Sequence, residues 1–452
     1  MKVLVANRGE IAVRVIRALK EMDFKSVAVY SEEDRSSSPV AMADEAWCLG
    51  ASPAKESYLN IGRILTAARL SGAQAVHPGY GFLSENDVFA SACEDAGLIF
   101  IGPKGSVMAN LANKAETKRL VKKAGVSVIP GSEGPLGNAQ EAMTQARETG
   151  YPVLLKASFG GGGRGIYLVR DEGELSRAYQ MAQSQANAAV GKKELYLEKF
   201  LENTRHVEVQ VALDIKSQGQ AFVERDCTIQ RRNQKLIEES PSPFLGEQAR
   251  AKLLEAGLRA AQACGISTLA TVEFLLMSDR KTFYFMEINK RIQVEHPVTE
   301  ELLGIDLVQL QIALAMGQRW APVAAKSDAR HAIEARINAE DPAHNFLPSE
   351  GVVTACQWPG GPGIRVDTYL TPYSTLGVSY DSLAAKIIAS SPHGRSGAVA
   401  RMRRALGELK LEGFSTTASL HQELFADSFF AGGEQWFSTR FLEEWLGRRK
   451  FN

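Results

Sequence analysis

Residues 287–297 read EINKRIQVEHP and alternate polar with apolar side chains. At the two-residue period of a β-strand, one face would carry Glu287, Asn289, Arg291, Gln293 and Glu295. A guanidinium fork suits a small oxyanion, an amide would lie beside it, and a carboxylate could take the proton of that anion. This row of side chains therefore predicts a site for chemistry on a small acidic molecule.

A second acid is predicted to lie beside this row. The β-rich runs 268–277 and 281–289 predict a hairpin, with the three residues between them as an odd-length turn. In that register Glu273 lies directly across from Glu287, with Cβ atoms about 5 Å apart. Two acids this close repel unless a cation lies between them, and Asn289 adds a third oxygen ligand of the kind that Mg²⁺ or Mn²⁺ prefers. An even-length turn would separate the acids, leaving a solvent-facing strand edge as the simpler interpretation.

The stretch KASFGGGGRGI at 156–166 contains four consecutive glycines. Ordering them costs backbone entropy, so a close approach to a ligand or a loop that opens and closes would explain them. Backbone N–H groups of such a loop can wrap phosphates. A Walker A loop is excluded because no Gly-Lys-Ser/Thr precedes a helix. A glycine-tipped hairpin over nucleotide phosphates and a plain flexible linker both remain open.

The surrounding elements fit an α/β protein. Roughly the first hundred residues repeat a strand–helix rhythm, with KVLVA, then a helix with apolar residues at helical spacing, then VAVY, AVHPGY and LIFIGP. This rhythm predicts an open parallel sheet. No GxGxxG follows the first strand, which argues against a dinucleotide fold. A basic helix is predicted over 113–124, and helices near 396–411 and 416–428.

Composition limits the function classes. The chain has 452 residues, 45% of them apolar and 23% charged, and its 52 Lys and Arg balance 52 Asp and Glu. It is therefore globular, with no net field to attract nucleic acid or an anionic membrane. The five cysteines form no CxxC pair and the N-terminal apolar stretch is too short for a signal peptide. We expect a cytoplasmic protein without nucleic-acid or membrane partners.

Long motifs in order along essentially the whole chain carry a resemblance. They are ANRGEIAVRVIRA at 6–18, HPGYGFLSEN at 77–86, KASFGGGGRG, RHVEVQV, RDCTIQRRNQK, EINKRIQVEHPVTE and ARINAEDP. The chain resembles the biotin carboxylases, which are ATP-grasp ligases. The resemblance implies a mixture of α/β and α+β structure in four parts: an N-terminal open parallel α/β domain (1–112), the ATP-grasp lid with its mobile glycine-rich loop (113–202), the central ATP-grasp domain with metal and bicarbonate sites (203–330), and a C-terminal mixed β/α domain (331–452).

The resemblance also assigns roles to residues. The positions that match the ATP site are Lys114, Lys156, Gly162, Gly163, Glu198, Lys199, Leu201, His206, Gln230, Asn233, Glu273 and Glu287. Those that match the metal ligands are Glu273, Glu287 and Asn289. Those that match the bicarbonate pocket are Lys235, Arg291, Gln293, Val294 and Glu295. The biotin ring is expected near Tyr80 and Arg336, and the catalytic residues are expected to be Lys235, Arg291, Glu295 and Arg336.

The implied chemistry has two stages. Bicarbonate, deprotonated by Glu295, attacks the γ-phosphate of ATP to give carboxyphosphate, which breaks down to CO₂ and phosphate. Phosphate takes the N1′ proton of biotin, and the ureido enolate, stabilised by Arg336, attacks CO₂. The cofactors are ATP with Mg²⁺ or Mn²⁺, and biotin is the carrier-bound substrate. The implied partners are a biotin carboxyl carrier protein and a carboxyltransferase subunit, and the implied assembly is a homodimer. Acetyl-CoA carboxylase, an enzyme of fatty acid biosynthesis, is one example of such a multisubunit carboxylase.

Alternatives come from two other classes. Another ATP-grasp ligase would join an acyl phosphate to an amine, and a non-catalytic nucleotide-binding subunit would have lost the key acids and arginine. RIQVEHP and the motifs of the second half disfavour the first, and intact catalytic positions disfavour the second. The final carboxyl acceptor is chosen by the transferase, so this sequence does not name it.

Three positions depart from the family pattern. Phe159 stands where many relatives have another glycine, Asn233 where a histidine is common, and Lys290 where a small or polar residue is usual. These departures affect the expected nucleotide affinity and remove no group that the chemistry requires. Cys227 is expected to be an inert buried thiol and His296 to make a structural hydrogen bond.

Overall fold

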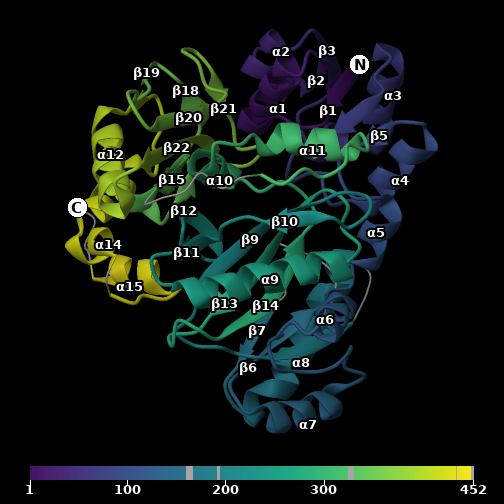
Figure 1. The fold of residues 1–452 in the computed structure, drawn as a ribbon, viewed down its shortest axis with the longest axis vertical. Helices are drawn as coiled ribbons and strands as arrows, with labels where there is room; N and C mark the ends of the chain where they lie inside the picture. The colour runs from purple at the N-terminus through teal and green to yellow at the C-terminus, as the bar shows by residue number, and fades with distance from the viewer. Residues whose placement is uncertain (159–165, 191–193, 324–329, 434, 449–452) are drawn as a thin grey trace.

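The computed structural model describes residues 1–158, 166–190, 194–323, 330–433 and 435–448. Figure 1 shows the N-terminal and C-terminal segments side by side at one end of an elongated molecule. The segment around residues 140–190 forms the opposite end, and a large sheet lies between them. Within the described residues, every helix is too short or too polar to cross a membrane.

The N-terminal unit is a five-stranded parallel sheet flanked by helices. Its strands, in the order β3-β2-β1-β4-β5, are β1 (Lys2–Val5), β2 (Lys25–Ser31), β3 (Glu45–Gly50), β4 (Ala75–His77) and β5 (Ile99–Phe100). The helices are α1 (Gly9–Glu21), α2 (Ser38–Met42), α3 (Ile61–Ser71), α4 (Asp87–Asp95) and α5 (Gly105–Asn110). Ile11, Val15, Ile16 and Leu19 of α1 are buried, as their spacing predicts. The predicted open parallel sheet is confirmed.

The opposite end of the molecule is a small antiparallel sheet packed on two helices. Its order is β7-β6-β8, with β6 (Val153–Ala157), β7 (Ile166–Val169) and β8 (Leu195–Lys199), and the helices are α7 (Ala139–Thr149) and α8 (Glu172–Val190). Helix α6 (Lys114–Lys123) leads into this unit, as predicted. Lys156 pairs with Ile166 across β6 and β7, which is the pairing that a hairpin requires. The glycine stretch at 159–165 lies outside the described residues.

The large sheet holds the middle of the molecule together. Its order is β14-β13-β9-β11-β12-β15-β22-β20, with β10 on β9. The strands are β9 (Arg205–Leu213), β10 (Gly219–Ala221), β11 (Arg225–Arg231), β12 (Gln234–Ser240), β13 (Leu269–Leu276), β14 (Phe283–Asn289), β15 (His331–Asn338), β20 (Ile364–Thr368) and β22 (Leu383–Ser391). Because β12 pairs with β15, this sheet continues across the boundary predicted at 330.

Helices cover the large sheet. Helix α9 (Glu247–Ala263) buries Leu253 and Ala260 against Val207 and Val209 of β9. Helices α12 (Gly394–Glu408) and α13 (Ala418–Ala426) cover β15 and β22, close to the ranges predicted for them. The remaining helices are α10 (His296–Leu303), α11 (Leu307–Ala315), α14 (Ser428–Gly432) and α15 (Phe441–Gly447), and short β pairs are β16 (Glu340–Asp341) with β17 (Leu347–Pro348), β18 (Gly351–Val352) with β21 (Thr375–Leu376), and β19 (Ala355–Gln357) with β23 (Lys410–Glu412).

The β13–β14 hairpin brings its acids together in a different way from the predicted one. The predicted three-residue turn is wrong, because the paired strands end at Leu276 and restart at Phe283. If the observed pairs Leu276–Phe283 and Phe274–Phe285 continued without interruption, Glu273 would face Met286 instead of Glu287. A β-bulge between Phe274 and Glu273 shifts the register, so Glu273 faces Glu287 after all. The predicted pairing of the two acids is therefore confirmed.

Candidate active site

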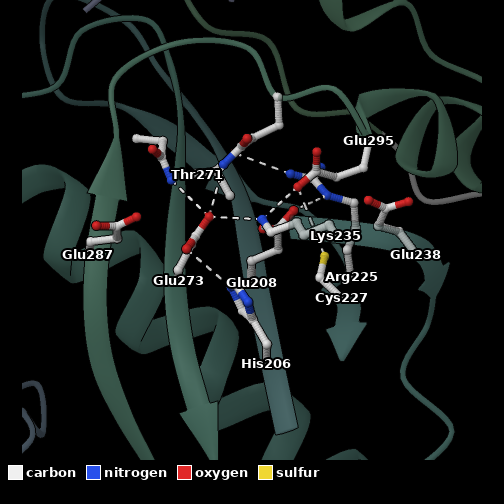
Figure 2. A network of polar contacts seen from close by, with 12 residues as sticks. His206, Glu208, Arg225, Cys227, Lys235, Glu238, Thr271, Glu273, Glu287 and Glu295 are labelled. Atoms are coloured by element: carbon white, nitrogen blue, oxygen red, sulfur yellow. Dashed lines mark hydrogen bonds and ion pairs between the residues drawn. The ribbon is translucent and has the colours of Figure 1, made fainter. Parts of the chain in front are cut away.

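Glu273 on β13 is the most heavily bonded acid of the hairpin (Figure 2). Its Oε1 accepts hydrogen bonds from Lys235 Nζ at 2.9 Å, Asn289 Nδ2 at 2.9 Å and Gln293 Nε2 at 3.1 Å. His206 Nε2 lies 3.1 Å from its Oε2. Burial raises the pKa of a carboxyl, but Lys235 and His206 hold the pKa of Glu273 below its ordinary value. Glu273 is therefore a fixed negative charge.

Glu287 forms the open side of the same hairpin. Its side chain is 35% exposed, and Lys114 Nζ donates to its Oε2 at 2.9 Å. Each of the two acids thus has a lysine as a positive partner, and Asn289 Oδ1 lies 3.4 Å from an Arg291 nitrogen. Two carboxylates and an amide oxygen that already attract cations suit a hard divalent ion. The predicted metal residues fit such an ion, although their role stays a prediction.

The segment that follows β14 differs from the prediction. Strand β14 ends at Asn289, and residues 290–295 form turns before α10 begins at His296. The expectation of a continuous strand face to Glu295 is wrong, because Pro297 in the first turn of α10 starts a helix here. The turns nevertheless return the polar side chains to the sheet, since Gln293 bonds Glu273. His296 Nδ1 lies 2.8 Å from the Gln293 carbonyl oxygen, consistent with its predicted structural role.

Arg291 is held between two neighbours. Its Nη1 donates to Gln293 Oε1 at 3.0 Å, and its Nε lies 3.3 Å from Glu85 Oε2. Glu85 belongs to the HPGYGFLSEN motif and also accepts from the backbone N–H of Lys290. Sequence reasoning assigned no role to Glu85, although its motif was recognised. The N-terminal unit therefore helps to orient the expected anion clamp.

Glu295 lies at the centre of the site and is fully buried. Lys235 Nζ donates to its Oε1 at 2.7 Å, and Arg336 Nη2 to its Oε2 at 2.9 Å. Burial alone would raise the pKa of Glu295, yet Lys235, Arg336 and Arg225 hold it well below its ordinary value. The structure thus places an ionised acceptor where the sequence predicts a general base. The carbonyl of Val294, the preceding residue, accepts from Lys386 Nζ at 2.9 Å.

Two buried residues without a predicted role complete this part of the site. Glu208 accepts from Lys235 and from Arg225, each at 2.6 Å. Arg225 also donates to Gln210, Thr271 and Thr299. The only sequence signal for Glu208 is the polar side chain at every second position of RHVEVQV, in an otherwise apolar strand. Glu208, Arg225, Lys235, Glu273 and Glu295 are called the buried charge cluster below.

The thiol of Cys227 lies at the edge of this cluster, with Sγ 4.0 Å from Glu295 Oε1. Burial and the nearby Glu208 raise its pKa well above the ordinary value. A protonated, buried thiol agrees with the expected inert role. His206, Glu208 and Glu273 also bring one ligand atom each within 4.8 Å of one another, a grouping that the sequence did not single out.

The predicted nucleotide residues occupy the side of the site next to the small sheet. Glu198 accepts from Lys156 at 2.6 Å and from Lys118 at 3.1 Å, and Lys118 is a residue that sequence reasoning missed. Lys199 Nζ donates to the carbonyls of Gly150 and Tyr151. Leu201 is partly buried just after β8.

The other predicted nucleotide positions are placed less uniformly. Gln230 Nε2 lies 2.6 Å from His206 Nδ1, which brings those two together. Asn233 is exposed in the tight turn between β11 and β12, where its φ of 65° suits asparagine. Gly162, Gly163 and Phe159 lie outside the described residues.

The residues expected near biotin lie on the opposite side of Glu295. Arg336 bridges Glu295 and Glu238, with its Nε 2.7 Å from Glu238 Oε1. The Tyr80 hydroxyl donates to Glu10 in α1. Burial raises the pKa of Tyr80 well above its ordinary value, and the charge of Arg336 acts against that rise.

Comparison with known proteins now adds to this geometry. Three family models match in order: "Biotin carboxylase, N-terminal domain" at residues 1–108, "Carbamoyl-phosphate synthase L chain, ATP binding domain" at 113–322, and "Biotin carboxylase C-terminal domain" at 334–444. Biotin carboxylase 1 of Bacillus subtilis is 46% identical over 445 residues, 98% of each chain. The chain belongs to the biotin carboxylase family. The small subunit of the 2-oxoglutarate carboxylase of Hydrogenobacter thermophilus is 46% identical over 98% of this chain and 93% of its own.

Solved structures of this family match the whole architecture. The biotin carboxylase of Campylobacter jejuni, solved as a β,γ-ATP complex, has a TM-score of 0.94 at 41% identity, covering 98% of each chain. The biotin carboxylase domain dimer of the Hydrogenobacter thermophilus 2-oxoglutarate carboxylase has a TM-score of 0.93 at 46% identity, covering 98% of this chain and 97% of its own. That dimer was solved with MgADP, ADP and bicarbonate. The predicted ATP-grasp fold and the family are confirmed, and the protein is an ATP-dependent ligase by family.

Proposed function

We propose that this protein carboxylates biotin on a carrier protein with bicarbonate and ATP, giving carboxybiotin, ADP and phosphate. One observation carries the proposal: the buried, ionised Glu295 lies between Lys235 and Arg336, beside the acids of the β13–β14 hairpin. A base beside two cations suits a small anion that must lose a proton before it attacks a phosphate. The bicarbonate in the Hydrogenobacter thermophilus domain supports this substrate.

Each residue predicted for the bicarbonate and metal sites then has a defined part in the first stage. Arg291 and Lys235 hold bicarbonate by charge-assisted hydrogen bonds, with Gln293 and the Val294 backbone beside them. Glu295 accepts the bicarbonate proton, and the anion attacks the γ-phosphate to give carboxyphosphate. Lys114 and Lys156 supply positive charge to the phosphates. Glu273, Glu287 and Asn289 would hold Mg²⁺ or Mn²⁺, which neutralises phosphate charge when bound.

In the second stage carboxyphosphate breaks down to CO₂ and phosphate, and phosphate takes the N1′ proton of biotin. Arg336 lies within reach of the same pocket and would stabilise the negative ureido oxygen before it attacks CO₂. Tyr80, whose hydroxyl donates to Glu10 of the N-terminal unit, would lie beside the biotin ring. The nucleotide would lie between the large sheet and the small sheet, held by Glu198, Lys199, Leu201, His206, Gln230, Asn233 and the glycine loop at Gly162 and Gly163.

The assembly is proposed from the same family membership. A biotin carboxyl carrier protein and a carboxyltransferase would complete the reaction, in a cytoplasmic complex built on a homodimer. The Bacillus subtilis biotin carboxylase and the small subunit of the 2-oxoglutarate carboxylase are equally identical to this chain, at 46%. The degree of sequence identity to these relatives therefore does not select one carboxyl acceptor. The four domain ranges predicted from the sequence also remain proposals.

ATP cleavage by the purified chain tests the function. With Mg²⁺, cleavage should require bicarbonate and rise when free biotin is added. Glu295→Ala should lower the bicarbonate-dependent rate at least about 100-fold, because a positioned base is lost. Glu255→Ala, on the exposed side of α9, is the matched control and should match the wild type.

Two outcomes would contradict the proposal. Equal turnover of the wild type and Glu295→Ala would reject the assigned base. ATP cleavage that ignores bicarbonate and responds to another carboxylic acid with an amine would favour the acyl-phosphate ligase instead.

A further inference from the structure

Two buried glutamates that the proposed chemistry does not use face each other across β12 and β15. Glu238 and Glu334 are direct partners in the antiparallel register, and both are fully buried. Directly opposed residues of such strands have Cβ atoms about 4.5–5.5 Å apart. Two ionised carboxylates at this separation repel strongly, and no solvent screens them here. Their ionisation states must therefore be linked.

The hydrogen bonds of the pair point to a missing proton donor. Glu238 Oε1 accepts from Arg336, but Glu238 Oε2 and both Glu334 carboxylate oxygens have no hydrogen-bond partner among the described residues. Buried ionised carboxylates nearly always accept several hydrogen bonds. A protonated carboxyl on one residue could donate to the other, which would give a partner to one oxygen of each acid. One shared proton is therefore the simplest way to join the two acids by a hydrogen bond.

The charged groups around the pair do not neutralise two negative charges. Arg336 is shared, because it also bonds Glu295 at 2.9 Å. Lys386 on β22 is the cation next to Glu334, but its Nζ bonds the Val294 carbonyl and lies 3.1 Å from Glu10. The other titratable or charged groups facing this region are Lys235 on β12, Glu295 before α10, His296 on α10, Glu10 on α1, and Arg365 and Asp367 on β20.

The electrostatics agree with the geometry. Burial outweighs Arg336 and raises the pKa of Glu238 to about 7. Burial, reinforced by Glu238 and Glu295, also raises the pKa of Glu334 well above its ordinary value, against Lys386 and Arg336. Both directions keep protons on this pair under conditions where Glu295 is ionised. The guanidinium of Arg336 thus lies between Glu295, whose pKa is lowered, and Glu238, whose pKa is raised.

We propose that Glu238 and Glu334 share one proton and that this proton sets the position of Arg336 between Glu238 and Glu295. With the proton present, the pair carries one negative charge and Arg336 contacts both Glu238 and Glu295. Loss of the proton adds a second negative charge on the Glu238 side and draws Arg336 away from Glu295. Glu334 is then a positioning residue that acts through Glu238. The consequence for catalysis rests on the function proposed above.

Infrared spectroscopy of the full chain tests the shared proton without any assay of activity. A pH titration of the wild type should show the C=O stretch of a protonated carboxyl group disappearing at alkaline pH. Both Glu238→Gln and Glu334→Gln should shift this band and the pH at which it disappears, because each removes one of the two carboxyl groups that share the proton, while burial continues to raise the pKa of the acid that remains. Glu255→Gln should leave the band unchanged. A band that changes in only one variant, or in neither, would overturn the sharing.

The pH dependence of bicarbonate-dependent ATP cleavage tests the positioning of Arg336. The wild-type rate should fall at alkaline pH. In Glu334→Gln this fall should move to higher pH by at least about one pH unit, since the second negative charge cannot form. The rate of Glu334→Gln at neutral pH should stay within about threefold of the wild type, because Arg336 keeps both partners. An unchanged alkaline fall would overturn the positioning role. If the infrared result holds while the wild type shows no bicarbonate dependence, the shared proton stands and the proposed function fails.

Discussion

The surroundings on the two faces of strand β12 shift the pKa values of two neighbouring glutamates in opposite directions. Glu238 faces Arg336 in the active site, whereas Glu239 lies on the opposite face, where Arg395 Nε of α12 and His331 Nε2 of β15 each lie 2.7 Å from its Oε2. Both acids are buried. Burial raises the pKa of a carboxyl, but Arg395 and His331 lower the pKa of Glu239 to about 2. On the other face, burial outweighs Arg336 and raises the pKa of Glu238 to about 7.

The difference lies in whether each acid shares its hydrogen-bond partners with another acid. Glu239 has two basic partners, and Arg395 also donates to the carbonyls of Phe430 and Ala431, so the group forms a closed network. Glu238 shares one arginine with Glu295 and faces another acid. Complete pairing stabilises a fold, while incomplete pairing leaves groups free to change charge or partner. The same residue type is therefore structural on one face and suited to function on the other.

Removing the paired acid should have the largest effect. Glu239→Gln leaves Arg395 buried beside a neutral amide, and breaking a buried ion pair from one side costs about 3–5 kcal/mol. The free energy of unfolding at pH 7.5, measured by urea denaturation, should fall by that amount. A loss below about 1 kcal/mol would mean that the network on the α12 side is not what stabilises this face.

Acid pH should reveal the same contrast through its sign. The pKa of Glu239 is lowered from an ordinary 4.5 to about 2, so its stabilisation is present above 4.5 and is lost as the pH falls toward 2. The difference in unfolding free energy between the wild type and Glu239→Gln should therefore shrink by roughly 3 kcal/mol between pH 6 and pH 2. Urea denaturation at several pH values measures it. A difference that stays constant with pH would show that Glu239 is not an ionised partner.

The sequence predicted which groups gather at the site better than it predicted the backbone that gathers them. The β-rich runs at 268–277 and 281–289 predict the hairpin that carries the two acids. The bulge that sets the register has no sequence pattern of its own. The predicted pairing of the acids is right although the predicted turn is wrong, because the bulge compensates for the different turn length. The strand predicted to continue to Glu295 ends at Asn289, since the helix that begins at His296, with Pro297 in its first turn, overrides the two-residue period.

Long-range pairing accounts for what the sequence did not predict. Glu238 and Glu334 lie on opposite sides of the boundary expected at 330, and only the pairing of β12 with β15 brings them together. Glu85 reaches Arg291 from the N-terminal unit, and Lys118 reaches Glu198 from α6. None of these contacts has a local signature, because the two partners are distant in the chain. Family motifs mark such residues as important without indicating which partner each one has.

The smallest change in the free energy of unfolding should come from substitution of Glu238, on the active-site face of β12. Glu238→Gln replaces a charged hydrogen-bond acceptor of Arg336 by a neutral amide oxygen, but Arg336 keeps Glu295, and the new amide N–H can take the place of the shared proton as donor to Glu334. These terms oppose each other, so the unfolding free energy at pH 7.5 should change by no more than about 1 kcal/mol, in either direction. Urea denaturation beside Glu239→Gln gives the matched comparison, because the two substitutions are chemically identical and adjacent.

Bicarbonate-dependent ATP cleavage should nevertheless fall severalfold in Glu238→Gln, since Arg336 loses the carboxylate that holds it opposite Glu295. A Glu238→Gln protein as unstable as Glu239→Gln, with unchanged kinetics in its folded fraction, would remove the distinction between the two faces.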